Sequence, residues 1–216
     1  MFTLQDMRDE LARVEGALDE WPSELERAAR IRRWLGEDSR ALFAQAAAEA
    51  ERVAVIDVNE HFHAYFGGLW HLAGEAKQAR RRLKRAASRV DWEPTPSGAA
   101  GVLYLLGKFD RAARLAPEEC EGWLARGARD RDPSLVLKAR DRCLSWQRLG
   151  GDAGPHEGSG YGTPLKDWDW IEETFRLEAE LRGTPVPSHL DILSACGVLR
   201  EPGEPVAAHD RDVEPG

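Results

Sequence analysis

The chain has 216 residues, enough to bury one good core, and 42% of them are hydrophobic and 31% charged. Such values exclude a disordered or fibrous chain. The 30 Lys and Arg against 38 Asp and Glu give a net charge of -8, which argues against general binding to nucleic-acid backbones or anionic membranes.

The N-terminal residues form neither a basic segment nor an apolar core, and no apolar run approaches the roughly 18 residues that span a bilayer. A cytoplasmic protein without membrane partners is therefore expected. Cys120, Cys143 and Cys196 are odd in number and widely spaced, which predicts neither a disulfide framework nor a zinc site. We expect three reduced and mostly buried thiols.

Residues 1–56 predict three helices. An apolar stripe with alternating spacings of three and four begins after Thr3, at Leu4, Met7, Leu11, Val14 and Leu18. Pro22 suits the first turn of a second helix that runs to Gly36 and packs on the first as a hairpin. A cap at Asp38–Ser39 begins a third helix, whose broad apolar face consists mainly of small residues.

Residues 57–149 predict further hairpins. Capping-box spacing from Asp57 to Glu60 can begin a new helix, although the third helix could equally run straight through. The helix that follows has two packable faces, as expected of an inner helix, and ends at Gly74. A basic helix spans 75–90, a loop 92–98, and four more helices follow, with Pro117 and Pro133 opening the last two.

Residues 150–164 hold six glycines and two prolines, the strongest loop signal in the chain and a candidate functional loop or lid. Residues 165–200 predict two C-terminal helices, the first opened at Pro164 and the second capped by Ser188 with Asp191. Residues 201–216 read as a loosely held acidic tail. No segment alternates like a strand, so residues 1–200 predict one all-α domain of nine or ten helices in stacked antiparallel hairpins or an irregular bundle.

Residues 63–83 resemble a tetratricopeptide repeat. The chain reads His63-x2-Phe66-Gly67-x2-Trp70, a turn at Gly74, and then Ala79-x3-Leu83. Gly67 and Ala79 have almost no side chain where the two helices of such a hairpin touch, and the large residues fill the space around them. The chain departs from the pattern at His63, which replaces the usual Trp, and at the closing Pro, which is displaced to Pro94.

A weaker echo begins 33 residues later, where residues 106–112 resemble the turn and the start of a second helix. The resemblance thus covers one repeat well and a second poorly. It implies a stack of helical hairpins that binds another protein or a peptide in a concave groove and performs no chemistry.

The densest group of possible metal ligands comprises Asp57, Glu60, His61, His63 and His71. Glu60-x2-His63 has the spacing of helical di-metal carboxylate sites, but no second Glu-x2-His is present. On a helical wheel the three imidazoles point about 80° apart in succession, so a regular helix would not gather them on one ion. The glycines of 158–162 lack the preceding strand and the Gly-Lys-Ser/Thr ending of a phosphate-binding loop.

The helix over 75–90 is strongly basic within an acidic protein: Lys77, Arg80, Arg81, Arg82, Lys84, Arg85 and Arg89. Such a face is either simply solvated or binds an acidic protein, with nucleic acid the least favoured partner. Eight tryptophans are unusually many. Trp70, Trp146 and Trp168 are expected in the core, and Trp92 and Trp123 at the surface.

These patterns favour a non-catalytic protein-binding helical scaffold that needs no cofactor. A bacterial immunity or antitoxin-like role, neutralising a partner, is one concrete use. The binding residues expected near the basic helix and at the surface are His61, Tyr65, Arg81, Arg85, Trp92 and Trp123. The alternative is a helical metal-dependent enzyme that uses Asp57, Glu60 and His63.

Overall fold

A computed structural model describes residues 3–16, 22–54, 60–88, 96–149 and 164–199. The described residues form eleven helices and no strand, one helix more than the upper limit predicted. The helices are α1 (Leu4–Glu15), α2 (Pro22–Trp34), α3 (Arg40–Val53), α4 (Glu60–Leu72), α5 (Ala76–Ala87), α6 (Pro96–Leu105), α7 (Phe109–Leu115), α8 (Cys120–Asp130), α9 (Pro133–Leu149), α10 (Asp167–Arg182) and α11 (His189–Ala195). The all-α prediction is confirmed.

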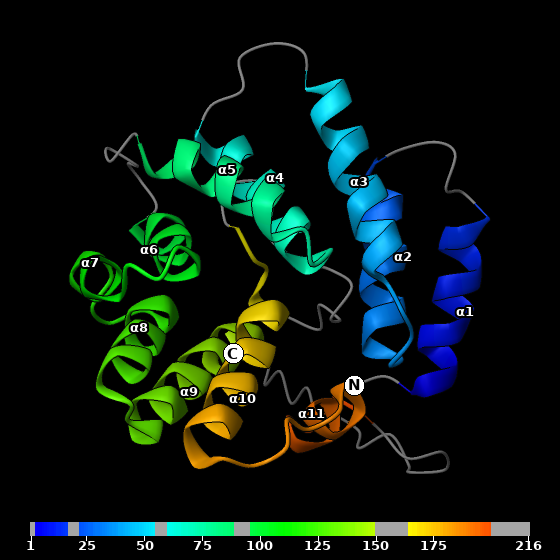
Figure 1. Cartoon of the computed structure of the whole chain (residues 1–216). Helices are drawn as coiled ribbons and strands as arrows, with labels where there is room; N and C mark the ends of the chain where they lie inside the picture. Colours follow the sequence, from blue (N-terminus) through cyan, green and yellow to red (C-terminus); the bar gives the residue numbers. More distant parts are fainter. Residues whose placement is uncertain (1–2, 17–21, 55–59, 89–95, 150–163, 200–216) are drawn as a thin grey trace, which may run out of the picture.

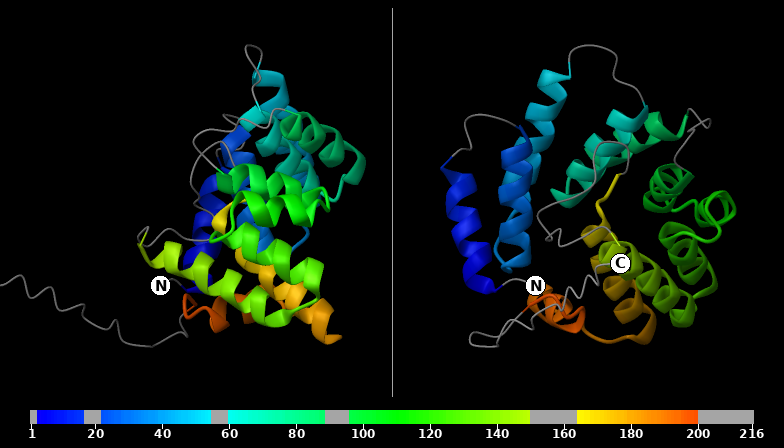
Figure 2. Two further views of the ribbon diagram at one scale, coloured as in Figure 1. Left: turned by 90° about the vertical axis from the view of Figure 1, so that its left-hand side faces the viewer. Right: turned by 180° about the vertical axis from the view of Figure 1, so that it is seen from behind.

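Consecutive helices pack against each other along the whole chain, and α11 returns to contact α2. Figures 1 and 2 show the result: the hairpins follow one another around the molecule, and the last helices lie beside the first. One hydrophobic cluster extends from Met7 in α1 to Leu193 in α11. A smaller cluster lies between α4, α5 and α6.

Five hairpins share the same corner. The residue after the first helix is left-handed at Gly36, Gly74, Gly107, Arg131 and Gly183, with φ between 54° and 80°. In each corner the next backbone N–H donates to a carbonyl five residues earlier, for example Glu75 to Trp70 at 2.9 Å. This bond satisfies a carbonyl that the helix end would otherwise leave without a partner. The predicted capping box of Ser188 and Asp191 is also present.

Two predicted helix starts are wrong. The helix expected from Pro117 begins at Cys120, because residues 116–119 form a turn in which the Glu119 N–H donates to the Ala116 carbonyl at 3.2 Å. The helix expected from Pro164 begins at Asp167. Asp169 fixes that start, since its carboxylate accepts from the Lys166 N–H at 2.8 Å.

The close contact predicted between Gly67 and the second helix of its hairpin is confirmed. A Cβ built on Gly67 would lie 2.7 Å from Cγ of Leu83 in α5. Ala79 and Leu83 are both buried, as expected. Gly67 therefore allows α4 and α5 to pack at short range.

Gly68 and Gly101 lie against the segment that leads into α10 and against the first turn of that helix. They lie 33 residues apart, at equivalent positions in α4 and α6 relative to the corners at Gly74 and Gly107. A Cβ on Gly68 would overlap the Pro164 carbonyl oxygen, and one on Gly101 would lie 2.7 Å from the ring of Trp170. The two glycines thus let the C-terminal part of the chain approach the backbone of two earlier hairpins.

The prediction of three reduced thiols is wrong for two of them. Cys120 at the start of α8 and Cys143 in α9 form a disulfide, with their Cα atoms 5.9 Å apart. Both are buried, as predicted, and their sequence separation of 23 gave no hint of pairing. The antiparallel packing of α8 on α9 brings them to bonding geometry. Cys196 lies outside this disulfide.

Candidate functional site

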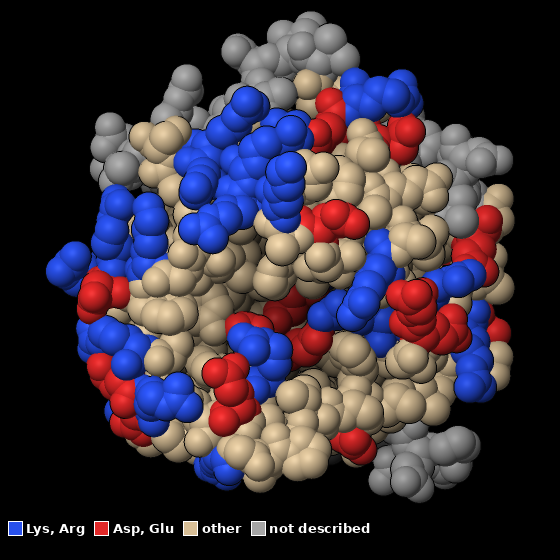
Figure 3. Space-filling model, viewed as in Figure 1, with Lys and Arg blue, Asp and Glu red and all other residues tan. Residues whose placement is uncertain are grey.

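The exposed side of α5 carries five cations: Lys77, Arg80, Arg81, Lys84 and Arg85, which we call the α5 basic surface. None of the five forms an ion pair with a described residue. Figure 3 shows Lys and Arg side chains as a broad blue area over α5, with acidic side chains at its edge and elsewhere on the same face of the molecule. Several exposed charges of one sign on one helix create a local positive potential on a protein of net charge -8.

The inward side of α5 holds this surface in place. Ala79, Leu83 and Ala86 are buried against α4 and α6. Arg82 differs from its basic neighbours, because it turns to α3 and donates to Glu51 at 2.8 Å through Nε. Glu51 also accepts from the indole N–H of Trp70 at 2.8 Å, and these donors lower the pKa of Glu51 although its partial burial acts to raise it. The helix is therefore fixed on one side and free for contact on the other.

The described residues that were predicted to bind a partner lie on three helices, α4, α5 and α8. His61 and Tyr65 are half-buried on α4. The Tyr65 hydroxyl donates to Glu26 of α2 at 2.5 Å and is thus used within the fold. Arg81 and Arg85 are exposed on α5, and Trp92 lies outside the described residues.

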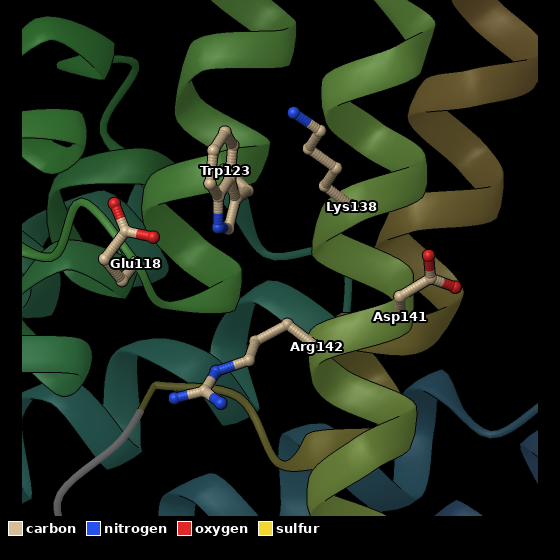
Figure 4. Close-up of a pocket in the computed structure, with 5 residues that line it drawn as sticks. All are labelled: Glu118, Trp123, Lys138, Asp141 and Arg142. Carbon is tan, nitrogen blue, oxygen red and sulfur yellow. The ribbon is translucent and has the colours of Figure 1, made fainter.

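Trp123 on α8 lines an open pocket of about 410 Å³, together with Glu118, Lys138, Asp141 and Arg142 (Figure 4). Its ring already has partners within the chain. The Arg126 guanidinium carbon lies 3.5 Å from the ring centroid and the Lys138 ammonium 4.9 Å. Trp123 thus joins α8 to α9 through cation–π contacts, and it is half-buried although it was expected at the surface.

Of the tryptophans expected in the core, Trp168 is fully buried and Trp70 is half-buried with its N–H bound to Glu51. The side chain of Trp146 lies outside the described residues. Trp168 packs edge-on against Trp34, with ring centroids 5.5 Å apart. These two rings anchor α10 on α2.

The proposed metal ligands belong largely to undescribed parts of the chain. Asp57 lies outside the described residues, as does the side chain of Glu60, while His63 is half-buried on α4. Within the described ranges, no three His, Cys, Asp or Glu side chains lie close enough together to hold a metal ion. No observation on these ranges favours the metal-enzyme alternative.

A buried ion network lies where the last helices meet the first. Arg30 of α2 donates to both carboxylate oxygens of Asp169 in α10, at 2.6 and 2.7 Å, and to Glu26 at 2.9 Å. Lys166 lies 3.0 Å from Glu26. Burial acts to raise the pKa of Glu26, but the charges of Arg30 and Lys166 and the Tyr65 hydroxyl outweigh it and lower the pKa to about 2. Every charge here is compensated, which is typical of a structural network.

Sequence reasoning missed a second set of exposed cations. Lys108, Arg111 and Arg114 lie at the start of α7 and along it, and none forms an ion pair with a described residue. The 33-residue echo was the available signal, because it aligns Arg114 with Arg81 of α5. The sequence pattern singled out only the basic helix, since α7 is short and its cations are separated by Asp110 and alanines.

Comparison of the chain with models of known families, with curated proteins and with solved structures gives no match. Among the helices that the structure describes, none is long and apolar enough to cross a membrane. The surface chemistry of the chain is therefore the guide to its function.

Proposed function

We propose that this protein is a non-catalytic helical scaffold that binds an acidic protein partner through the α5 basic surface. The supporting observation is the set of five exposed cations, none of which forms an ion pair with a described carboxylate. Desolvating a cation is unfavourable unless an opposite charge replaces the lost water, so such a surface selects an acidic partner. As part of this proposal, α4 and α5 form a hairpin of the tetratricopeptide type, which the pattern of residues 63–83 resembles.

Arg81 and Arg85 are the contact residues on which the proposal depends. Tyr65 is left out because its hydroxyl is bound to Glu26. Trp123 is left out because its ring is held by Arg126 and Lys138. We include the neutralising role of an immunity or antitoxin-like protein as one use of such a scaffold, supported by small size and acidic charge.

The test is affinity capture from the native host with three immobilised proteins: wild type, the double variant Arg81→Glu with Arg85→Glu, and Arg8→Glu. Arg8 is an exposed arginine on α1, so its reversal controls for general charge. We expect a partner that wild type and Arg8→Glu retain and the α5 variant loses, with retention falling as salt is raised. Equal retention by all three proteins would contradict the proposal.

A further inference from the structure

The α5 basic surface continues onto a second hairpin. Lys108, Arg111 and Arg114 are exposed at α7, and Figure 3 shows Lys and Arg side chains over α7 beside those over α5. The one acidic residue of α7, Asp110, lies 3.3 Å from Arg129 of α8, so its charge is compensated. Eight exposed cations thus belong to two neighbouring hairpins: Lys77, Arg80, Arg81, Lys84, Arg85, Lys108, Arg111 and Arg114.

The repeat of the hairpin explains why the two sets lie together. The corners at Gly74 and Gly107 have the same left-handed backbone and lie 33 residues apart. This register gives Arg114 the position on α7 that Arg81 has on α5. Because α6 packs on both α5 and α7, the two second helices flank the same helix in the stack.

We propose that α5 and α7 together bind one extended acidic polypeptide segment of the partner. The inference rests on the proposed function and names the chemistry of its ligand. The cations from Lys77 to Arg85 extend over about 12 Å at about 1.5 Å per residue. An extended strand at about 3.3 Å per residue covers that length with about four residues, so a segment that also reaches α7 is longer.

Two observations favour polypeptide over nucleic acid. Among the described residues, the surface offers no ring on which bases could stack, because α5 has no aromatic residue and Phe109 of α7 is half-buried, 5.4 Å from Tyr104. The cations also form a local patch on a chain of net charge -8, so a long polyphosphate backbone would extend from them onto acidic surface. A short acidic segment fits within the patch.

The experiment measures binding of fluorescein-labelled poly-L-glutamate by fluorescence anisotropy, with duplex DNA and single-stranded RNA as competitors at equal charge. The α7 variant is Arg111→Glu with Arg114→Glu, and its matched control is Arg111→Lys with Arg114→Lys, which keeps the charge. We expect the glutamate variant to bind about tenfold more weakly, a change of about 1.4 kcal/mol. The lysine variant should bind like wild type, and circular dichroism verifies that each variant is folded.

The α5 variant and Arg8→Glu are measured in parallel to separate the possible outcomes. If the α5 variant loses binding and the α7 variant keeps it, this inference is wrong and the proposed function stands. If both variants bind like wild type, or if wild type binds no polyglutamate, then this inference and the proposed function are both wrong. Tighter binding of either nucleic acid would overturn the assignment to a polypeptide.

Discussion

At the scale of single residues, Glu121 is a buried carboxyl group with few hydrogen-bond partners. It lies in the first turn of α8, is 3% exposed, and accepts one hydrogen bond from the Ser97 hydroxyl at 2.6 Å. Its other carboxylate oxygen is buried without a partner. Burial, reinforced by the nearby charges of Glu119 and Asp167, raises the pKa of Glu121 to about 7.

The raised pKa predicts a pH-dependent stability. The unfolded chain ionises Glu121 near pH 4.5 and the folded chain near pH 7, so its contribution is full below pH 4.5 and is lost as pH rises through 7. The loss amounts to about 3 kcal/mol. Glu121→Gln removes the titration, so its unfolding free energy in urea should gain on that of wild type between about pH 5 and about pH 8. A constant difference across this range would contradict the assignment.

At the scale of helices, close packing depends on particular glycines. At Gly67 the neighbour is a Leu83 side chain, which can shift by changing rotamer, whereas at Gly68 it is the Pro164 backbone. Alanine in a helix interior is favoured over glycine by about 1 kcal/mol, so a loss of stability here would report the contact itself. Substitutions at Gly67 therefore test a contact with a side chain that can move, and substitutions at Gly68 test a contact with backbone that cannot.

We expect Gly68→Ala and Gly67→Leu each to lower the unfolding free energy by about 1–3 kcal/mol, because both overfill a tight contact. Gly67→Ala should be milder, since Leu83 can move. Gly16→Ala is the control: among the described residues, its Cβ would meet only ordinary contacts at 3.5 Å or more. Chemical denaturation measures all four variants, and a Gly68→Ala protein as stable as wild type would refute the contact with Pro164.

At the scale of the whole molecule, the limits of sequence reasoning follow from distance along the chain. Helix ends at Gly74 and Gly107 and the cap at Ser188 were predictable, because a helix end is determined by neighbouring residues. Contacts such as Arg30 with Asp169, 139 residues apart, carry no local signal. The disulfide likewise depends on which helices meet in space.

In the candidate site too, features determined by neighbouring residues were predictable and contacts between distant residues were not. Local composition was enough to single out the basic helix, and periodicity placed Ala79 and Leu83 on its inward side. Which of its cations stay exposed was not predictable, since Arg82 finds Glu51 on another hairpin. The part that we propose for α7 became visible only with the corner geometry that the two hairpins share.

Arg30 of α2 holds α10 in place through its buried ion pair with Asp169. Arg30→Met keeps much of the side-chain volume but leaves Asp169, which is 3% exposed, without its main counter-charge. Removing one partner of a buried pair lowers stability by about 3–5 kcal/mol, because the remaining charge stays buried and uncompensated. We expect a loss of this size in urea denaturation. Arg13→Met, which breaks an exposed pair on α1, should leave the midpoint almost unchanged.

The double variant Arg30→Met with Asp169→Asn tests the reason for the loss. Asparagine can still accept the Lys166 N–H at the start of α10, so that cap is preserved while both charges are removed. If an uncompensated buried carboxylate is the cause, the double variant should be more stable than Arg30→Met alone. Equal losses would mean that Arg30 acts through packing against Phe43, whose ring centroid lies 5.8 Å from the guanidinium carbon.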